Sequence, residues 1–129
     1  MIEVGMEYTL ELKVGENDTA RALGSGELEV FATPRMCALM EESAYKCVMA
    51  ELEEGASTVG TLMNVKHVSA TPVGMEVTAT AEITEIDGRR VCFSVKAYDE
   101  AGLIGEGTHE RFIVYSEKFI VRTYSKLKK

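Results

Sequence analysis

The chain has 129 residues, of which 46% are hydrophobic and 27% are charged, and its formal net charge is −7. This length and composition are typical of one folded domain and exclude a disordered or fibrous chain. The acidic balance argues against nucleic acid as a partner, because neutralising phosphates requires clustered Lys and Arg. No run of about 18 apolar residues is present, so the sequence predicts no membrane-spanning segment.

The charge is divided unevenly along the chain. Residues 1–110 carry 8 Lys and Arg against 20 Asp and Glu, a net of −12, whereas residues 111–129 carry 6 against 1, a net of +5. Such a basic end is either a solvated tail or the contact surface for a small polyanion. We interpret residues 1–129 as a single domain, with residues 119–129 as a basic C-terminal extension.

The predicted elements begin with a strand near residues 8–14 and a loop that contains Gly and Ser at residues 22–26. A helix is predicted from Pro34 to about Glu54, because Thr33 suits the N-cap, Pro34 suits the first helical position, and Gly55 ends the pattern. An apolar stripe runs along this helix: Cys37, Met40, Ala44, Cys47, Val48 and Leu52. The polar face carries Arg35, Glu42, Lys46 and Glu53, in which Glu42 and Lys46 are spaced for an ion pair.

Four strands are predicted after the helix, at residues 58–71, 75–84, 90–97 and 103–115. Turns at residues 72–74, at Asp87-Gly88 and at Ala101-Gly102 separate them, and Asp87-Gly88 is a strong hairpin signal. We expect the four strands to form a meander. One helix cannot cover both faces of such a sheet, so the predicted fold class is α+β, with a curved antiparallel sheet wrapped around one long central helix.

The three cysteines, Cys37, Cys47 and Cys92, are odd in number and have no C-x-x-C spacing. This pattern favours a reducing compartment over a disulfide scaffold or a zinc site, and buried apolar roles for the three thiols. The N-terminus has neither the basic flank nor the apolar core of a secretory signal, so a cytoplasmic location is predicted. No metal site is expected, because the two histidines lack a ligand spacing.

Three polar residues break the apolar pattern. Glu41 lies in the middle of the apolar stripe, where a carboxylate is costly unless it has a partner, such as an arginine or a backbone amide, or a function. Alternation along its strand places His67 on the side that faces the helix, together with Val59, Thr61, Met63 and Val65. A core histidine bonded to a hydroxyl is the alternative for His67, and N-capping alone explains Thr33.

Taken together, the three residues indicate a reaction centre. Glu41 lies a little over two turns beyond Thr33 on the helix, and the strand that carries His67 should pack against that helix. A hydroxyl, a carboxylate and an imidazole are the groups required for acyl transfer with an activated nucleophile or a general base. Helix-start amides and the backbone at Gly60 could supply oxyanion donors.

At these positions the sequence resembles a known family. The matching residues run in order from residue 29 to residue 118, and they are Val30-Phe31-Ala32-Thr33, Leu39-Met40-Glu41, Gly60-Thr61, His67-x-x-Ala70-Thr71-Pro72-x-Gly74 and Gly107-Thr108-His109-Glu110-Arg111. This pattern is similar to that of the fluoroacetyl-CoA thioesterase-like hotdog proteins. The resemblance implies a hotdog fold whose dimer joins two sheets into one, as a homodimer or a dimer of dimers.

The resemblance also implies hydrolysis of an acyl-coenzyme A thioester. The family's catalytic threonine, glutamate and histidine match Thr33, Glu41 and His67, while its active-site glycine and arginine match Gly60 and Arg111. Glu41 would then act as nucleophile or as base on a water, Thr33 would hydrogen-bond the carboxylate or attack, and His67 would pass the proton to the leaving thiolate. Coenzyme A is part of the substrate, so no separate cofactor is expected.

Two features shape the expected substrate. The plain segment at residues 22–28 lacks the aromatic- and proline-containing lid of the fluoroacetyl-CoA enzymes, so we expect some other short- or medium-chain acyl group. The phosphates of coenzyme A need cationic partners, for which Arg111 is the first candidate and Lys118 and Arg122 follow. The alternative function is a non-catalytic acyl-CoA- or CoA-binding hotdog module, which would have no need of a carboxylate on an apolar face.

Overall fold

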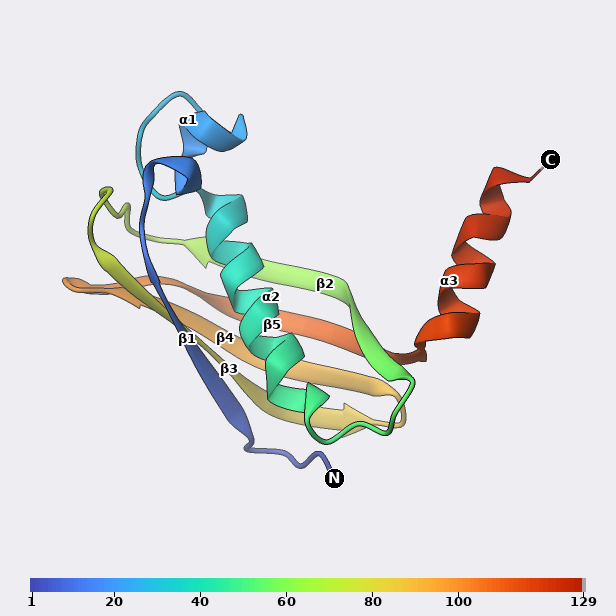
Figure 1. Cartoon of the computed structure of the whole chain (residues 1–129). Coiled ribbons are helices and arrows are strands. Elements are labelled where there is room, and N and C mark those ends of the chain that lie inside the picture. The colour runs from blue at the N-terminus through green and yellow to red at the C-terminus, as the bar shows by residue number, and fades with distance from the viewer. Residues whose placement is uncertain (129) are drawn as a thin grey trace.

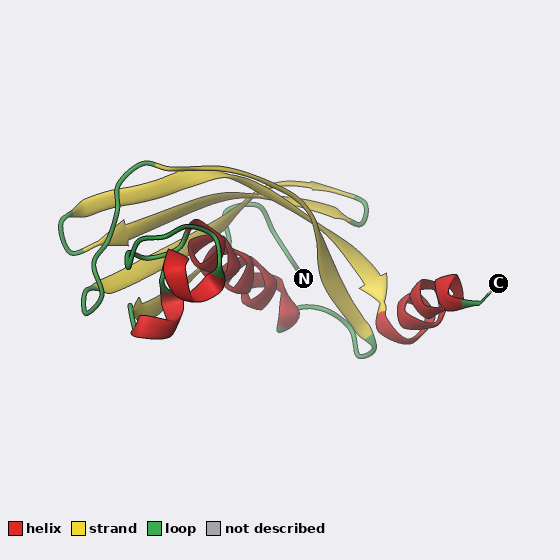
Figure 2. Ribbon diagram, turned by 90° about the horizontal axis from the view of Figure 1, so that it is seen from above, coloured by secondary structure: helices red, strands yellow, loops and turns green. Residues whose placement is uncertain are grey.

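The structure, a computed structural model, describes residues 1–128. In chain order the elements are β1 (Glu7–Lys13), the 3₁₀ turn η1 (Glu16–Asp18), α1 (Ala20–Leu23), α2 (Thr33–Met49), β2 (Ala56–His67), β3 (Glu76–Asp87), β4 (Arg90–Asp99), β5 (Gly102–Tyr115), α3 (Ser116–Tyr124) and the 3₁₀ turn η2 (Ser125–Leu127). The strands form one antiparallel sheet that curves around α2 (Figure 1 and Figure 2). The predicted α+β hotdog fold is therefore confirmed.

The strand order in the sheet is β1-β3-β4-β5-β2, which corrects one prediction. Strands β3, β4 and β5 form a meander, and Gly88 takes a positive φ of 63° in the two-residue turn between β3 and β4. β2 does not join this meander, because it pairs with β5 at the edge opposite β1. Alternating polarity identifies a segment as a strand but carries no information about its neighbour, and the predicted four-strand meander was wrong for that reason.

The core lies between α2 and the inner face of the sheet. The predicted alternation is confirmed on two strands, whose inward residues are fully buried: Val77, Ala79, Ala81 and Ile83 on β3, and Val91, Phe93, Val95 and Ala97 on β4. The residues that α2 buries are Met36, Leu39, Met40, Ser43, Ala44, Cys47 and Val48. Each large side chain buried in this way contributes about 1.5–3 kcal/mol, so this contact holds α2 against the sheet.

Both ends of α2 differ from the prediction. The helix ends at Met49 rather than near Glu54, and residues 50–55 turn toward β2 with Gly55 at a φ of 90°. At the other end, Ala32 is the N-cap and makes no side-chain capping bond, while Thr33 is the first helical residue. The hydroxyl of Thr33 is therefore free for another contact, and capping does not explain this residue.

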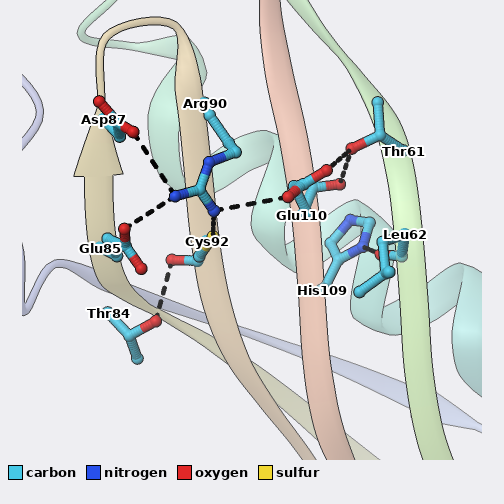
Figure 3. Close-up of polar contacts among 9 residues, drawn as sticks. All are labelled: Thr61, Leu62, Thr84, Glu85, Asp87, Arg90, Cys92, His109 and Glu110. Atoms are coloured by element: carbon cyan, nitrogen blue, oxygen red, sulfur yellow. Dashed lines mark hydrogen bonds and ion pairs between the residues drawn. The ribbon is translucent and has the colours of Figure 1, made fainter.

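A β-bulge in β2 changes which side chains face the helix. Gly60 pairs with Arg111 and Leu62 pairs with Glu110, so Thr61 is the extra residue. Its hydroxyl donates to the Glu110 carboxylate at 2.6 Å (Figure 3). One inserted residue reverses the alternation along a strand. The predicted common face of Val59, Thr61 and His67 was wrong, because Thr58 and Gly60 face inward before the bulge and Met63, Val65 and His67 face inward after it.

The basic C-terminal segment contains a helix. α3 begins at Ser116, three residues before the predicted extension, and projects from the end of β5 away from the sheet (Figure 1). Lys129 lies outside the described residues. None of the helices among residues 1–128 is both long enough and apolar enough to cross a membrane.

Candidate active site

Thr33 and His67 form the first group of the candidate site. The first residue of α2 and the last residue of β2 meet, and Thr33 Oγ1 lies 2.7 Å from His67 Nδ1. The rings of His67 and Phe31 are nearly perpendicular, with a centroid distance of 6.4 Å and an interplanar angle of 83°. The sequence predicted that this strand would pack against the helix, and the contact confirms it.

The imidazole of His67 has one nitrogen in use and one free. Among the described residues, its buried Nε2 has no hydrogen-bond partner. Burial lowers the pKa of His67, and a backbone contact at Ser69 opposes this only in part. A neutral imidazole beside a hydroxyl can accept the hydroxyl proton, and a buried ring nitrogen without a partner is costly unless something else binds it.

An open cavity of about 290 Å³ lies over this pair. It is lined by the pair itself and by small or apolar residues from α1, the loop that follows it, the start of α2 and the segment after β2: Ala20, Ser25, Val30, Phe31, Pro34, Val68, Ser69 and Ala70. A thioester placed in the cavity would lie directly against the Thr33 hydroxyl, so the cavity is a candidate acyl site.

Glu41 belongs to a second group with Gly60 and Arg111. Its side chain is 46% exposed, so it lies at the border of the buried helix face rather than in the middle of the stripe, as the sequence had suggested. Its Oε2 lies 3.9 Å from Arg111 Nη1. A Cβ added at Gly60 would lie 2.8 Å from the same oxygen, so a glycine is needed where the carboxylate approaches β2.

Arg111 is a buried cation with several anchors. It is only 7% exposed, its Nε donates to Thr58 Oγ1 at 2.8 Å, and its Nη2 donates to the Thr58 carbonyl at 3.1 Å. Burial lowers the pKa of the guanidinium and the carboxylate of Glu41 opposes this, so the group stays charged. Its position inside the fold fits contact with Glu41 better than contact with the phosphates of coenzyme A.

The sequence did not identify Thr58 and His109 as parts of this group. Thr58 was hidden by the bulge, which put it on the wrong predicted face, and His109 was named in a matched motif and in the metal question but was given no role in the site. His109 is 1% exposed, its Nδ1 lies 2.8 Å from the Leu62 carbonyl (Figure 3), and its Nε2 lies 3.2 Å from Arg111 Nη1. Its spacing of two residues before Arg111, which puts both on one face of a strand, was the available signal.

The two groups lie apart within one chain. Eight helical residues separate Thr33 from Glu41, which corresponds to about 12 Å along the axis of α2. Seven residues separate Gly60 from His67, which is about 23 Å along β2. One chain therefore assembles Thr33 with His67, and Glu41 with Gly60 and Arg111, but it does not bring the two groups into contact.

The molecule has one long helix wrapped by a five-stranded antiparallel sheet, and a hydroxyl–imidazole pair lies at the start of that helix. This arrangement is that of the hotdog-fold proteins. A sequence profile of the fluoroacetyl-CoA-specific thioesterases matches residues 14–117. A fluoroacetyl-CoA thioesterase from Streptantibioticus cattleyicolor is 39% identical over 131 aligned residues, which cover 97% of this chain and 94% of the relative.

Solved structures agree with this match. A structure of fluoroacetyl-CoA thioesterase superimposes with a TM-score of 0.92 at 39% identity and covers 98% of each chain. A thioesterase superfamily member from Thermus thermophilus has a TM-score of 0.89 at 32% identity, covering 99% of this chain and 94% of its own. The chain belongs to the fluoroacetyl-CoA-specific thioesterase family, and with it to the thioester hydrolases of the hotdog superfamily.

Proposed function

We propose that the protein hydrolyses short- or medium-chain acyl-coenzyme A thioesters with Thr33, Glu41 and His67. The observation that carries this proposal is the 2.7 Å contact between Thr33 Oγ1 and His67 Nδ1 beside a cavity. A hydroxyl that is not needed as a helix cap and lies against a neutral imidazole is the arrangement of an activated nucleophile or of a proton relay.

The proposed roles divide between the two groups. Glu41 attacks the thioester carbonyl or takes a proton from the attacking water, and Arg111 Nη1 holds its carboxylate. Thr33 either hydrogen-bonds that carboxylate or attacks in its place. His67 delivers the proton to the leaving thiolate. Amides at the start of α2 stabilise the oxyanion.

A second copy of the chain would complete the site. β2 is an edge strand of the sheet, and Leu62 at its centre is 50% exposed. Antiparallel pairing of two such edges about a two-fold axis near Met63 and Asn64 places the partner's His67 opposite Gly60, beside Glu41. We therefore propose a homodimer that joins the two sheets and draws each site from both subunits.

The proposed acyl group is of short or medium length, and the proposed enzyme is not specific for fluoroacetyl-CoA. Several relatives are named for fluoroacetyl-CoA. In this chain the segment before Val30 is a single helical turn, α1, followed by the loop at residues 24–29, and its sequence has neither an aromatic residue nor a proline. The cavity of about 290 Å³ is open and lined by small and apolar side chains, among them Val30 and Phe31, which suits a short or medium acyl chain.

The cationic partners of the coenzyme A phosphates are proposed to be Lys118 and Arg122. With Arg89, these side chains border a groove between α3 and the outer face of β5, which is also lined by Phe112 and Tyr115. They belong to the basic end of an otherwise acidic chain. Charged donors of this kind bind pyrophosphate and 3′-phosphate groups.

A panel of acyl-CoAs from acetyl to palmitoyl, including fluoroacetyl-CoA and assayed by free-thiol release, tests the function. We expect kcat/KM to be highest for short or medium chains and to fall by about 100-fold or more in Thr33→Ala, Glu41→Gln and His67→Ala. Glu42→Gln is the matched control, because this neighbouring carboxylate pairs with Lys46 at 2.9 Å on the exposed face. Background thiol release for every substrate, with coenzyme A binding retained, would instead identify a binding module.

A further inference from the structure

His109 is a buried titratable residue to which the proposed reaction assigns no role. It lies on β5 with 1% of its surface exposed, and its ring packs against Phe93 at a centroid distance of 5.9 Å. An apolar side chain would fill this position without the cost of burying two ring nitrogens. The partners of those two nitrogens therefore show what the histidine does.

The contacts of His109 define its tautomer. A guanidinium can only donate hydrogen bonds, so His109 Nε2, which lies 3.2 Å from Arg111 Nη1, must be the acceptor. The ring hydrogen is then on Nδ1, which donates to the Leu62 carbonyl at 2.8 Å. Leu62 directly follows the bulge that sets the phase of β2. One neutral ring thus connects the bulge to the arginine.

The contact with His109 completes the set of hydrogen bonds that hold the Arg111 guanidinium. Its Nε and Nη2 are bound by Thr58, which leaves Nη1 as the group nearest Glu41 Oε2, at 3.9 Å. The acceptor on His109 is the third anchor of the guanidinium and the one bound to Nη1 itself. Without it, the two contacts with Thr58 alone would hold the planar guanidinium, and Nη1 would lose its hydrogen-bond acceptor.

The surroundings of His109 keep its ring neutral, as the acceptor role requires. Burial lowers the pKa of His109, and the charge of Arg111 lowers it further. The Leu62 carbonyl, Glu41 and Glu110 oppose this shift without reversing it. At neutral pH the lone pair on Nε2 therefore remains available to Arg111.

We propose that His109 is a positioning residue of the hydrolysis reaction. It fixes Arg111 Nη1 beside the Glu41 carboxylate and, through Leu62, holds the bulge that places Gly60 under that carboxylate. This inference rests on the proposed role of Glu41. It assigns to His109 no contact with the substrate, so its effect is on the rate of the chemical step rather than on substrate binding.

Three substitutions separate the two contacts. His109→Gln can present an acceptor near the position of Nε2, His109→Asn can present a donor near the position of Nδ1, and His109→Leu presents neither. We expect kcat to fall by about 10- to 100-fold in His109→Leu and His109→Asn with KM little changed, and His109→Gln to recover most of the rate. Val95→Ala, a core truncation away from the site, should lower the melting temperature without lowering kcat.

A double-mutant cycle tests whether His109 acts through Arg111. In the Arg111→Met background, His109→Leu should cause little further loss of kcat, because the contact it removes is already absent. Additive losses, or rates that follow melting temperature across the three His109 variants, would overturn the inference and leave a packing role. A Glu41→Gln protein with full activity would instead contradict the proposed function.

Nitrogen-15 NMR of the imidazole rings gives a readout that is independent of activity. In the wild-type protein His109 should be the Nδ1–H tautomer at pH 7, and it should remain so in Glu41→Gln. In Arg111→Met the Nε2 signal should shift as its donor is lost. An Nε2–H tautomer in the wild-type protein would contradict the inference whatever the enzyme hydrolyses.

Discussion

The two histidines of the chain lie in surroundings that disfavour the imidazolium form. Burial lowers the pKa of His67 and of His109 from the usual value of 6.5. As the pH falls through this value, the histidines of the unfolded chain bind protons that those of the folded chain do not. The free energy of unfolding therefore decreases with falling pH, by up to about 1.4 kcal/mol per pH unit for each histidine, until the folded-state pKa is reached.

Urea unfolding between pH 5 and pH 8 measures this dependence. Stability should be greatest above pH 6.5 and should decline below it. His67→Gln should reduce the slope in this window, because one of the two titrating rings is gone. A slope that is unchanged in this variant would show that the imidazole of His67 titrates in the folded protein as it does in the unfolded chain.

At the scale of elements, the contact between α2 and β2 depends on a single missing methyl group. A Cβ at Gly60 would lie 2.8 Å from Glu41 Oε2, and His109 Cε1 and Arg111 Nη1 lie at 3.3 and 3.4 Å. The flexible end of Glu41 can move away, whereas the two anchored side chains cannot. Gly60→Ala should therefore fold with a melting temperature close to that of the wild type but lose about 10- to 100-fold in kcat, because the carboxylate is displaced. Ser57→Ala, earlier on β2, should keep full activity, and equal losses in both variants would exclude a specific role for Gly60.

The helix and the strands also show which parts of the fold and the site can be predicted from the sequence. The inward residues of β3 and β4 were predictable because the alternating run from Val77 to Ile83 ends before the register shift between Ile83 and Glu85. The helix α2 was predictable from its apolar stripe and from Pro34. The bulge at Thr61 was not, because an inserted residue leaves no mark in the polarity pattern and reverses the face of everything before it. Thr33 was predicted both to be an N-cap and to belong to a reaction centre with Glu41 and His67; the N-cap is Ala32 instead, and the Thr33 hydroxyl contacts His67.

At the scale of the whole molecule, a predicted cytoplasmic homodimer remains a prediction, but the separation of the two groups gives it a specific consequence. If each site takes Glu41 from one subunit and Thr33 with His67 from the other, two inactive variants can restore one another. A dimer of one Glu41→Gln chain and one His67→Ala chain has one site with both defects and one site with none. Random mixing makes half of the dimers mixed, and each mixed dimer has one intact site of two. About one quarter of the wild-type activity should therefore return.

The pairing of variants provides its own control. Co-refolded Glu41→Gln and Thr33→Ala chains should also recover about one quarter of the wild-type activity, because these residues come from different half-sites. Thr33→Ala mixed with His67→Ala should stay at background, because the 2.7 Å contact places both residues in the same half-site. Recovery in no mixture, although mixed dimers are detected by mass spectrometry, would mean that each chain closes its own site. Glu41, about 12 Å from Thr33 along the same helix, would then take no part in a reaction at Thr33.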